Sequence, residues 1–165
     1  MRVTERTQYA TVRDYEKYFA PEFVKALQDA AEAQFGAMYD LTFAEFHALA
    51  NGDFSRLGDM SNPTVLQVYW TKRFAAFVEE FANTLKKLQV KPTADEEQAG
   101  ANLLPVSWAE GLLVFLQKFF GLQSYKQAEQ ITLGELLIAK RAQYNEDMYK
   151  RRLQTIQLRK MRKQL

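Results

Sequence analysis

The chain has 165 residues, of which 47% are hydrophobic, 13% aromatic and 25% charged, and its formal net charge at pH 7 is +2. This length fits one domain with one core, and the apolar content can offset the conformational entropy lost on folding, which excludes wholesale disorder. The sequence has no cysteine and a single histidine, His47, which excludes disulfide bonds, a thiolate nucleophile and metal sites built on cysteines or several histidines. No run reaches the roughly 18 apolar residues of a membrane span, and the first residues lack the apolar stretch of a signal peptide, so we expect a cytoplasmic protein.

The first predicted helix covers residues 21–35 and ends before Gly36. Helix-start motifs then recur along the chain. In each, a Ser or Thr side chain can accept a hydrogen bond from the backbone N–H three residues later, where a Glu or Gln side chain reaches back. The motif occurs at Thr42 with Glu45, Thr93 with Glu96, Ser107 with Glu110, Ser124 with Gln127, and Thr132 with Glu135.

The longest regular apolar pattern follows Asn62 and Pro63, which suit the cap and the first position of a helix. Its apolar residues, three and four apart, are Leu66, Trp70, Phe74, Phe77, Phe81, Leu85 and Leu88. This spacing predicts the central core helix, which the Lys91-Pro92 pair would close. Exposed aromatic residues could stack on nucleic-acid bases, but the spacing here is typical of a buried stripe and favours core packing.

The stretch over residues 112–116, which continues to Phe119 and Phe120, is apolar on nearly all sides and is followed by Gly121, a residue type that commonly ends helices. We expect this segment to be a helix and the most buried element of the protein. A strand over residues 112–116 is the alternative. The cap at Ser107 and the length of the segment favour the helix.

Charge separates the C-terminal segment from the rest of the chain. Before Lys140 there are 13 basic and 18 acidic residues, whereas residues 140–165 contain 9 basic and 2 acidic ones, with no acidic residue after Asp147. This change predicts a helical core domain over residues 1–139 and a basic helical extension over residues 140–165. The fold is expected to be all-α, a single bundle of about six helices that ends in a long basic helix.

The predicted C-terminal helix begins after Thr132 and contains no Gly or Pro beyond Gly134, so it can outrun the domain. On its second half, Tyr149, Leu153 and Ile156 form an apolar seam, shorter than the roughly three to four heptads of a coiled coil. The other candidate contact residues are the cations Lys150, Arg151, Arg152, Arg159, Lys160, Arg162 and Lys163. The helix dipole favours cations at this end, which explains only part of the run.

Three kinds of surface could attract this basic helix: an acidic protein, nucleic-acid phosphate or an anionic membrane. The membrane ranks last because the helix lacks a continuous apolar face. We therefore expect an interaction or assembly module that binds a partner protein or another copy through this helix. The alternative is a nucleic-acid-associated protein whose affinity for phosphate falls steeply with salt.

Sequence motifs of catalysis are missing: the chain has no glycine-rich phosphate loop, no Gly-x-Ser-x-Gly motif and no His-Glu-x-x-His pair. His47 could act as a general base, but no triad is recognisable around it, which favours an ordinary helix histidine. The pair Glu79-Glu80 and the run over residues 95–97 could attract a cation, but neighbouring residues on a helix do not converge on one point. We expect no enzyme activity, no catalytic or metal-binding residue and no cofactor.

The segments Leu41-Thr42-Phe43-Ala44-Glu45-Phe46 and Ile131-Thr132-Leu133-Gly134-Glu135-Leu136 share one helix-start design. On a small helical chain with a basic tail, they resemble segments of bacteriophage or prophage tail-assembly chaperone proteins. The resemblance implies a non-enzymatic helical protein that binds another phage protein, such as the tape measure, through exposed helix faces and that self-associates. It assigns a role to no individual residue, since no binding motif can be matched residue by residue.

Overall fold

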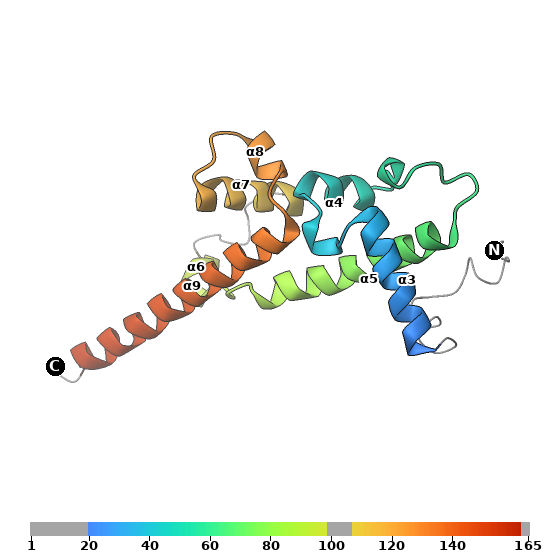
Figure 1. The fold of residues 1–165 in the computed structure, drawn as a ribbon. Coiled ribbons are helices and arrows are strands. Elements are labelled where there is room, and N and C mark those ends of the chain that lie inside the picture. The colour runs from blue at the N-terminus through green and yellow to red at the C-terminus, as the bar shows by residue number, and fades with distance from the viewer. Residues whose placement is uncertain (1–19, 99–106, 163–165) are drawn as a thin grey trace. The chain divides into compact units, whose positions relative to one another are not determined.

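The computed structural model describes residues 20–98 and 107–162, which Figure 1 shows as a ribbon. The helices are α3 (Pro21–Phe35), α4 (Phe43–Ala50), α5 (Val65–Lys87), α6 (Ala94–Gln98), α7 (Trp108–Phe120), α8 (Tyr125–Glu129) and α9 (Leu133–Arg162), with short 3-10 helices at Met38–Asp40 and Ser55–Leu57. No strand occurs in these two ranges, and the predicted all-α fold is confirmed. None of the helices described combines the length and the apolar character needed to cross a membrane.

The chain packs into two compact units, residues 1–83 and 84–165, and the boundary between them falls inside α5. The length of the chain predicts a single core, but in the structure the contacts divide the chain into these two units. The predicted division into a core domain over residues 1–139 and an extension over residues 140–165 rests on charge and stays a prediction. Along the backbone, α9 runs without a break across that position.

The core of the first unit is an aromatic cluster built on α5. Trp70, Phe74, Phe77 and Phe81 are each at most 5% exposed. The Trp70 and Phe74 rings stack with their centroids 5.6 Å apart, and Phe46 of α4 meets the Phe74 ring edge-on at 5.8 Å. Aromatic pairs at such distances stabilise a core beyond the apolar area that they bury. These rings are therefore core residues, as predicted, and do not lie open to nucleic-acid bases.

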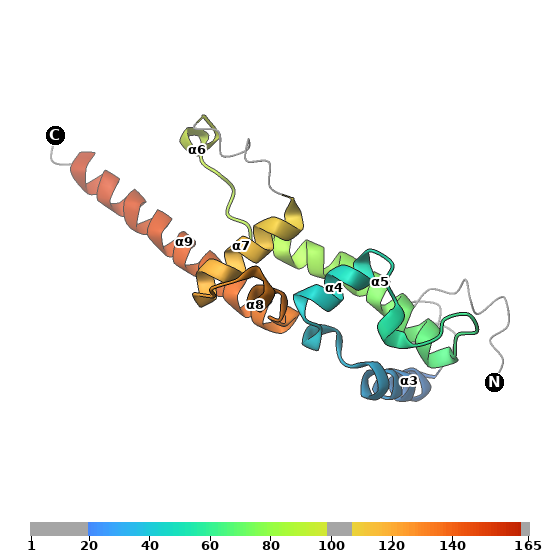
Figure 2. The ribbon, with the colours of Figure 1, turned by 90° about the horizontal axis from the view of Figure 1, so that it is seen from above.

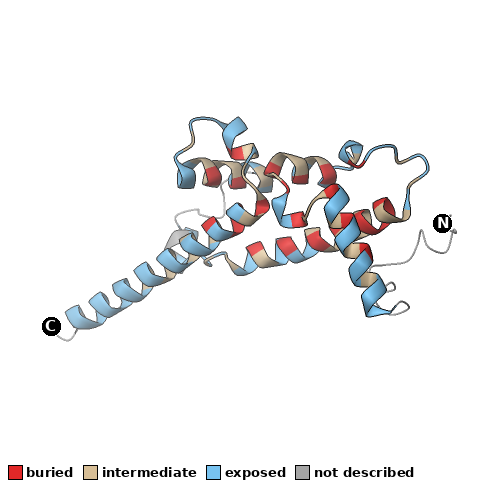
Figure 3. Cartoon of the chain, viewed as in Figure 1, coloured by how far each residue is buried: buried red, intermediate tan, exposed pale blue. Residues whose placement is uncertain are grey.

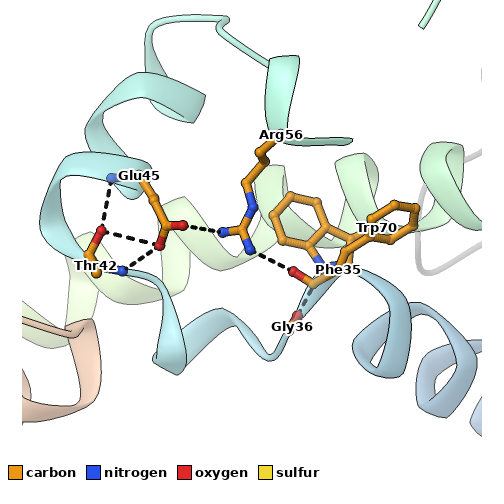
Figure 4. Close-up of polar contacts among 6 residues, drawn as sticks. All are labelled: Phe35, Gly36, Thr42, Glu45, Arg56 and Trp70. Atoms are coloured by element: carbon orange, nitrogen blue, oxygen red, sulfur yellow. Dashed lines mark hydrogen bonds and ion pairs between the residues drawn. The ribbon is translucent and has the colours of Figure 1, made fainter. Parts of the chain in front are cut away.

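Polar contacts hold the connection between α3 and α4 onto this core (Figure 4). The indole N–H of Trp70 donates to the carbonyl oxygen of Gly36 at 3.1 Å. Arg56 Nη2 donates to the carbonyl oxygen of Phe35 at 2.9 Å, and Arg56 Nη1 lies 3.4 Å from Glu45 Oε1. Gly36 has φ 86° and ψ 157°, a region that is essentially restricted to glycine, so the turn after α3 depends on this residue.

Capping boxes begin α4, α7 and α9, as predicted from the sequence. Thr42 Oγ1 accepts a hydrogen bond from the Glu45 N–H at 3.2 Å, while Glu45 Oε2 accepts one from the Thr42 N–H at 2.9 Å. Thr132 and Glu135 form the same two bonds at 3.2 and 2.9 Å. A third box begins α7, and Ser124 caps α8. Each box satisfies backbone N–H groups that the first turn of a helix leaves without a partner.

The start of α5 differs from the prediction. Asn62 and Pro63 were expected to begin this helix, but its first residue is Val65. Thr64 and Gln67 decide the position: Thr64 Oγ1 accepts from the Gln67 N–H at 3.2 Å, and Gln67 Oε1 accepts from the Thr64 N–H at 2.7 Å. This reciprocal pair replaces the predicted cap because it satisfies two backbone N–H groups at once.

The expectation that α7 is the most buried element is wrong, although its helical form is as predicted. Of its residues, Leu112 and Leu116 are buried, whereas Trp108, Phe119 and Phe120 are 49%, 44% and 41% exposed. Two residues four apart bury one narrow stripe of a helix, and α8 and α9 pack along α7. The apolar residues elsewhere on α7 therefore contribute to the surface of the second unit.

The long helix α9 is anchored by its first two turns. Leu133, Leu136 and Ala139 are completely buried. The helix has 30 residues and is therefore about 45 Å long at 1.5 Å per residue. In the two perpendicular views of Figures 1 and 2, its last turns extend beyond α7 and α8 of the same unit.

Candidate functional site

The predicted contact residues lie on the distal half of α9, which we define as residues 149–161. Apart from Arg151, which is partly buried, every residue of this stretch is exposed, and the last turns of α9 have the pale blue of exposed residues in Figure 3. Helices in proteins gain most of their stability from packing an amphipathic face. The distal half of α9 packs little of its surface within the unit and exposes its side chains to solvent.

Two of the predicted cations make contacts within the second unit. Lys150 Nζ lies 2.6 Å from Glu146 Oε1, and this hydrogen bond raises the pKa of Lys150. Arg151 Nη1 donates to the carbonyl oxygen of Lys91 at 2.8 Å. The other predicted cations are Arg152, Arg159 and Lys160, which are exposed, and Arg162 and Lys163, whose side chains lie outside the described residues. Within the part of the chain that the structure describes, the three exposed cations form no ion pair.

Apolar side chains share this exposed helix. The seam residues Tyr149, Leu153 and Ile156 are 65%, 41% and 49% exposed. With 3.6 residues per turn, the three project within about 60° of one another, so they form one face as predicted. Leu158 and Met161 are also exposed and project from other sides. A protein partner can bury such side chains, whereas contacts with phosphate make no use of them.

A groove between α7 and α9 is a second surface of the same unit, and it was not predicted from the sequence. Its volume is about 460 Å³. Its lining includes the apolar residues Val114, Phe115 and Phe119 of α7 and the lysines Lys118, Lys140 and Lys150. We call Phe115 and Phe119 the aromatic wall; their ring centroids lie 5.5 Å apart. The spacing of three and four on α7 marks these residues as one face, but the α9 side of the groove depends on how the two helices pack.

Lys140 has the most distinctive environment in the groove. Its Nζ lies 3.6 Å from the centroid of the Phe115 ring, well within the range of cation–π attraction. Lys140 is half-buried, and this burial lowers its pKa, an effect that the charge of Asp147 partly offsets. Neither Lys118 nor Lys140 forms an ion pair with another described residue. The groove therefore combines an aromatic surface with a partly desolvated ammonium group.

The other residues considered for chemistry belong to ordinary helix surfaces. His47 is exposed on α4, where its ring stacks against Phe43 with centroids 6.3 Å apart and its carbonyl oxygen accepts a hydrogen bond from Asn51 Nδ2 at 2.8 Å. The pair Glu79-Glu80 is exposed on α5, and the side chains of residues 95–96 lie outside the described part. Among the described residues, no group of three or more His, Asp or Glu could hold a metal ion.

The distal half of α9 and the groove adjoin one another along a single helix. Glu146 and Lys150 line the groove, and Leu153 follows them on the same side because residues three and four apart are neighbours on a helix surface. The two surfaces offer complementary chemistry for contact: exposed cations and apolar side chains on one, and an aromatic wall with lysines on the other. The chain matches no protein-family model, no curated protein and no solved structure.

Proposed function

We propose that this protein is a non-catalytic interaction or assembly module that binds a partner protein, or a second copy of itself, through the distal half of α9. The observation that carries the proposal is the presence of an exposed apolar seam and exposed cations on one regular helix. Within this proposal the protein acts in the cytoplasm. The resemblance of its two helix-start segments to tail-assembly chaperones makes virion tail assembly the process we assign to it.

The seam supports a protein partner because apolar side chains gain free energy when they leave water. Full burial of a Leu or Ile side chain contributes about 1.5–3 kcal/mol. An amphipathic helix that lays such residues into a groove of its partner is a recurrent mode of recognition. The flanking cations would contact acidic residues at the rim of the partner's binding surface. Charges at such a rim affect the rate of association and the register of the complex more than its affinity.

Binding of nucleic acid through phosphate is the alternative function, and the exposed residues Arg152, Arg159 and Lys160 support it. Such contacts would be independent of base sequence, because phosphate contacts carry no sequence information. They would leave the seam exposed to water. We therefore propose the protein partner as the function and treat phosphate binding as the outcome that would overturn it.

Two matched triple variants of the full chain test the proposal. The seam variant is Tyr149→Ser, Leu153→Ser and Ile156→Ser, and the cation variant is Arg152→Gln, Arg159→Gln and Lys160→Gln. Because every altered residue is exposed, both variants should retain the helical circular dichroism of the wild type. Complexes are isolated from the producing cells after nuclease treatment, and their stoichiometry is measured by light scattering and mass spectrometry.

We expect the wild type to form a stoichiometric, nuclease-resistant protein complex or a homo-oligomer that the seam variant loses. A complex that the seam variant forms as well as the wild type contradicts the proposal. Affinity for DNA or RNA that falls steeply with salt, and that the cation variant alone loses, would replace it with the nucleic-acid function.

A further inference from the structure

We propose that the groove between α7 and α9 binds an acidic, amphipathic segment of a partner protein, with a carboxylate of that segment at Lys118 and Lys140 and an apolar side chain against the aromatic wall. The inference rests on the proposed function, because it names the chemistry of the partner. It concerns a surface distinct from the seam, so the two can be tested separately.

The shape of the groove suits part of a peptide. Its volume of about 460 Å³ falls within the range of roughly 300–1,000 Å³ that ligand sites occupy. Phe119 is 44% exposed, so the aromatic wall presents an open apolar surface to an incoming side chain. Two helices flank the groove, as they do where proteins bind an amphipathic helix.

The charges in the groove favour an acidic occupant. Glu146 and Lys150 neutralise each other in an ion pair of 2.6 Å. Lys118 and Lys140 then face one remaining carboxylate, that of Asp147, so the lining keeps an excess positive charge. The segment over residues 140–165, which contributes the α9 side of the groove, contains 9 basic and 2 acidic residues.

Lys140 gives the strongest reason for a carboxylate partner. Removing an ammonium group from water costs free energy unless an opposite charge or hydrogen bonds compensate. Within the described residues this compensation consists of the Phe115 ring at 3.6 Å and the more distant charge of Asp147. A carboxylate placed at the mouth of the groove would supply the ion pair that Lys140 does not form with any described residue.

Two observations favour a peptide over a nucleic acid in the groove. The remaining carboxylate of the lining, Asp147, would repel a phosphate backbone that carries one charge per nucleotide. A peptide can place a single carboxylate at the lysines and uncharged atoms elsewhere. The apolar part of the lining then meets an apolar side chain.

The experiment uses two synthetic amphipathic peptides of about 15 residues, which span about four helical turns. Both have leucines at helical spacings of three and four and glutamine at the remaining positions, except that one peptide, the glutamate peptide, carries a single glutamate one turn from a leucine where the glutamine peptide has glutamine. Each is titrated into the ¹⁵N-labelled full chain, and binding is followed by amide chemical shifts and by fluorescence anisotropy. We expect the glutamate peptide to bind saturably and to shift amides of α7 and of residues 140–150. The glutamine peptide should bind about tenfold more weakly, equivalent to about 1.4 kcal/mol.

Charge-matched variants of the full chain assign the interaction. Lys118→Gln with Lys140→Gln should lower the affinity for the glutamate peptide about tenfold and remove its advantage over the glutamine peptide. The control, Lys86→Gln with Lys126→Gln, changes the same charge at exposed lysines that do not line the groove, and should leave the affinity within about twofold. Phe119→Ser should weaken both peptides, because both use the aromatic wall.

Several results would overturn the inference. They are the absence of saturable binding, shifts confined to other helices, or equal losses in the groove and control variants. A dimer of the chain that the groove variant loses would assign the groove to a second copy. Binding of a single-stranded oligonucleotide that is lost in the groove variant would assign it to nucleic acid. If the seam variant keeps both its natural complex and its affinity for the glutamate peptide, the proposed function fails while the groove assignment stands.

Discussion

Arg56 Nη2 donates a hydrogen bond of 2.9 Å to the carbonyl oxygen of Phe35, the last residue of α3. The guanidinium carbon of Arg56 also lies 5.9 Å from the centroid of the Trp70 ring, and Nη1 forms an ion pair with Glu45. One side chain therefore satisfies a carbonyl at a helix end and links α3, α4 and α5 within the first unit (Figure 4).

Replacement of Arg56 by glutamine should lower the free energy of unfolding of the first unit by about 1–2 kcal/mol, because a charged hydrogen bond is lost together with a partly exposed ion pair. The chain has two tryptophans, Trp70 and Trp108. In a Trp108→Phe background, the fluorescence of Trp70 reports the urea unfolding of the first unit. Lys25→Gln, at an exposed position of α3, is the control. Equal midpoints for the Arg56 variant and this control would contradict the prediction.

Gly36→Ala should destabilise the first unit by roughly 1–3 kcal/mol, since φ 86° and ψ 157° lie in a region closed to residues with a Cβ atom. Overlap with more distant residues is not the cause, because the added Cβ would lie 3.6 Å from Arg56 Nη2, an ordinary contact. Gly121 provides the comparison: its φ 65° and ψ 32° are left-handed helical, a conformation that asparagine tolerates. Gly121→Asn should therefore be more stable than Gly121→Ala and recover most of the lost stability. Gly36→Asn should be no more stable than Gly36→Ala, and thermal unfolding of the four variants measures the difference.

Ser107 should control the titration of Glu110. The Ser107 hydroxyl and, secondarily, its backbone N–H hold the pKa of Glu110 below its ordinary value of 4.5. A carboxyl group with a lowered folded-state pKa adds stability that is present above pH 4.5 and is lost as the pH falls through the lowered value. Carboxyl ¹³C chemical shifts should show that Ser107→Ala raises the pKa of Glu110 toward 4.5, whereas Ser107→Thr keeps it low. An unchanged titration in the alanine variant would exclude this hydrogen bond.

Phe115→Leu should lower the pKa of Lys140 further, by less than about one unit, because the ring attraction that favours the charged form is worth about 0.5–1 kcal/mol. Burial makes the folded chain hold this proton less tightly than the unfolded chain, so stability rises as the pH rises from the lowered pKa toward 10.5. The Lys140 Cε chemical shift measures the titration. Phe120→Leu, at a residue that does not line the groove, should leave it unchanged; a shift of the same size there would contradict a specific role for Phe115.

Deletion of residues 152–165 should leave cooperative unfolding intact, with a change in free energy within about 0.5 kcal/mol, because the described residues removed are all exposed. Deletion from Asp147 onward should cost about 1 kcal/mol more, since it also removes the hydrogen bond from Arg151 to the Lys91 carbonyl. Both deletions should abolish the complex described above. Loss of the cooperative transition in the shorter deletion would show that the distal half of α9 belongs to the fold.

Features that depend on residues close together in the sequence were predictable. The capping box at Thr42 joins residues three apart, and the aromatic stripe of α5 follows from helical periodicity alone. The exact start of α5 was not predictable, because Asn62 and Thr64 are both suitable caps two residues apart. The choice depends on the Gln67 side chain, whose Nε2 also donates to the Leu57 carbonyl at 2.7 Å in the folded chain.

Features that depend on packing between helices were missed. The composition of α7 indicates burial, but how much of it is covered depends on which helices lie beside it and on which sides. The groove was missed for the same reason, because it also depends on packing between helices. The sequence around Lys140 does not distinguish this residue from Arg141; only the packing of α7 places the Phe115 ring against Lys140. The seam and the cations of α9 could be identified from the sequence, because their identification requires only the helical spacing and the charge of nearby residues and no knowledge of how other helices pack.

Because α9 is buried at its start and exposed in its last turns, its backbone amide protons should exchange with solvent along a gradient. The amides that follow Leu133 and Leu136 are held by the packed core, whereas those beyond Arg152 are protected only while the terminal turns resist fraying. A bound molecule would suppress this fraying and slow the exchange of the last turns selectively. Deuterium uptake in those turns would therefore report occupancy of the helix, whatever molecule occupies it.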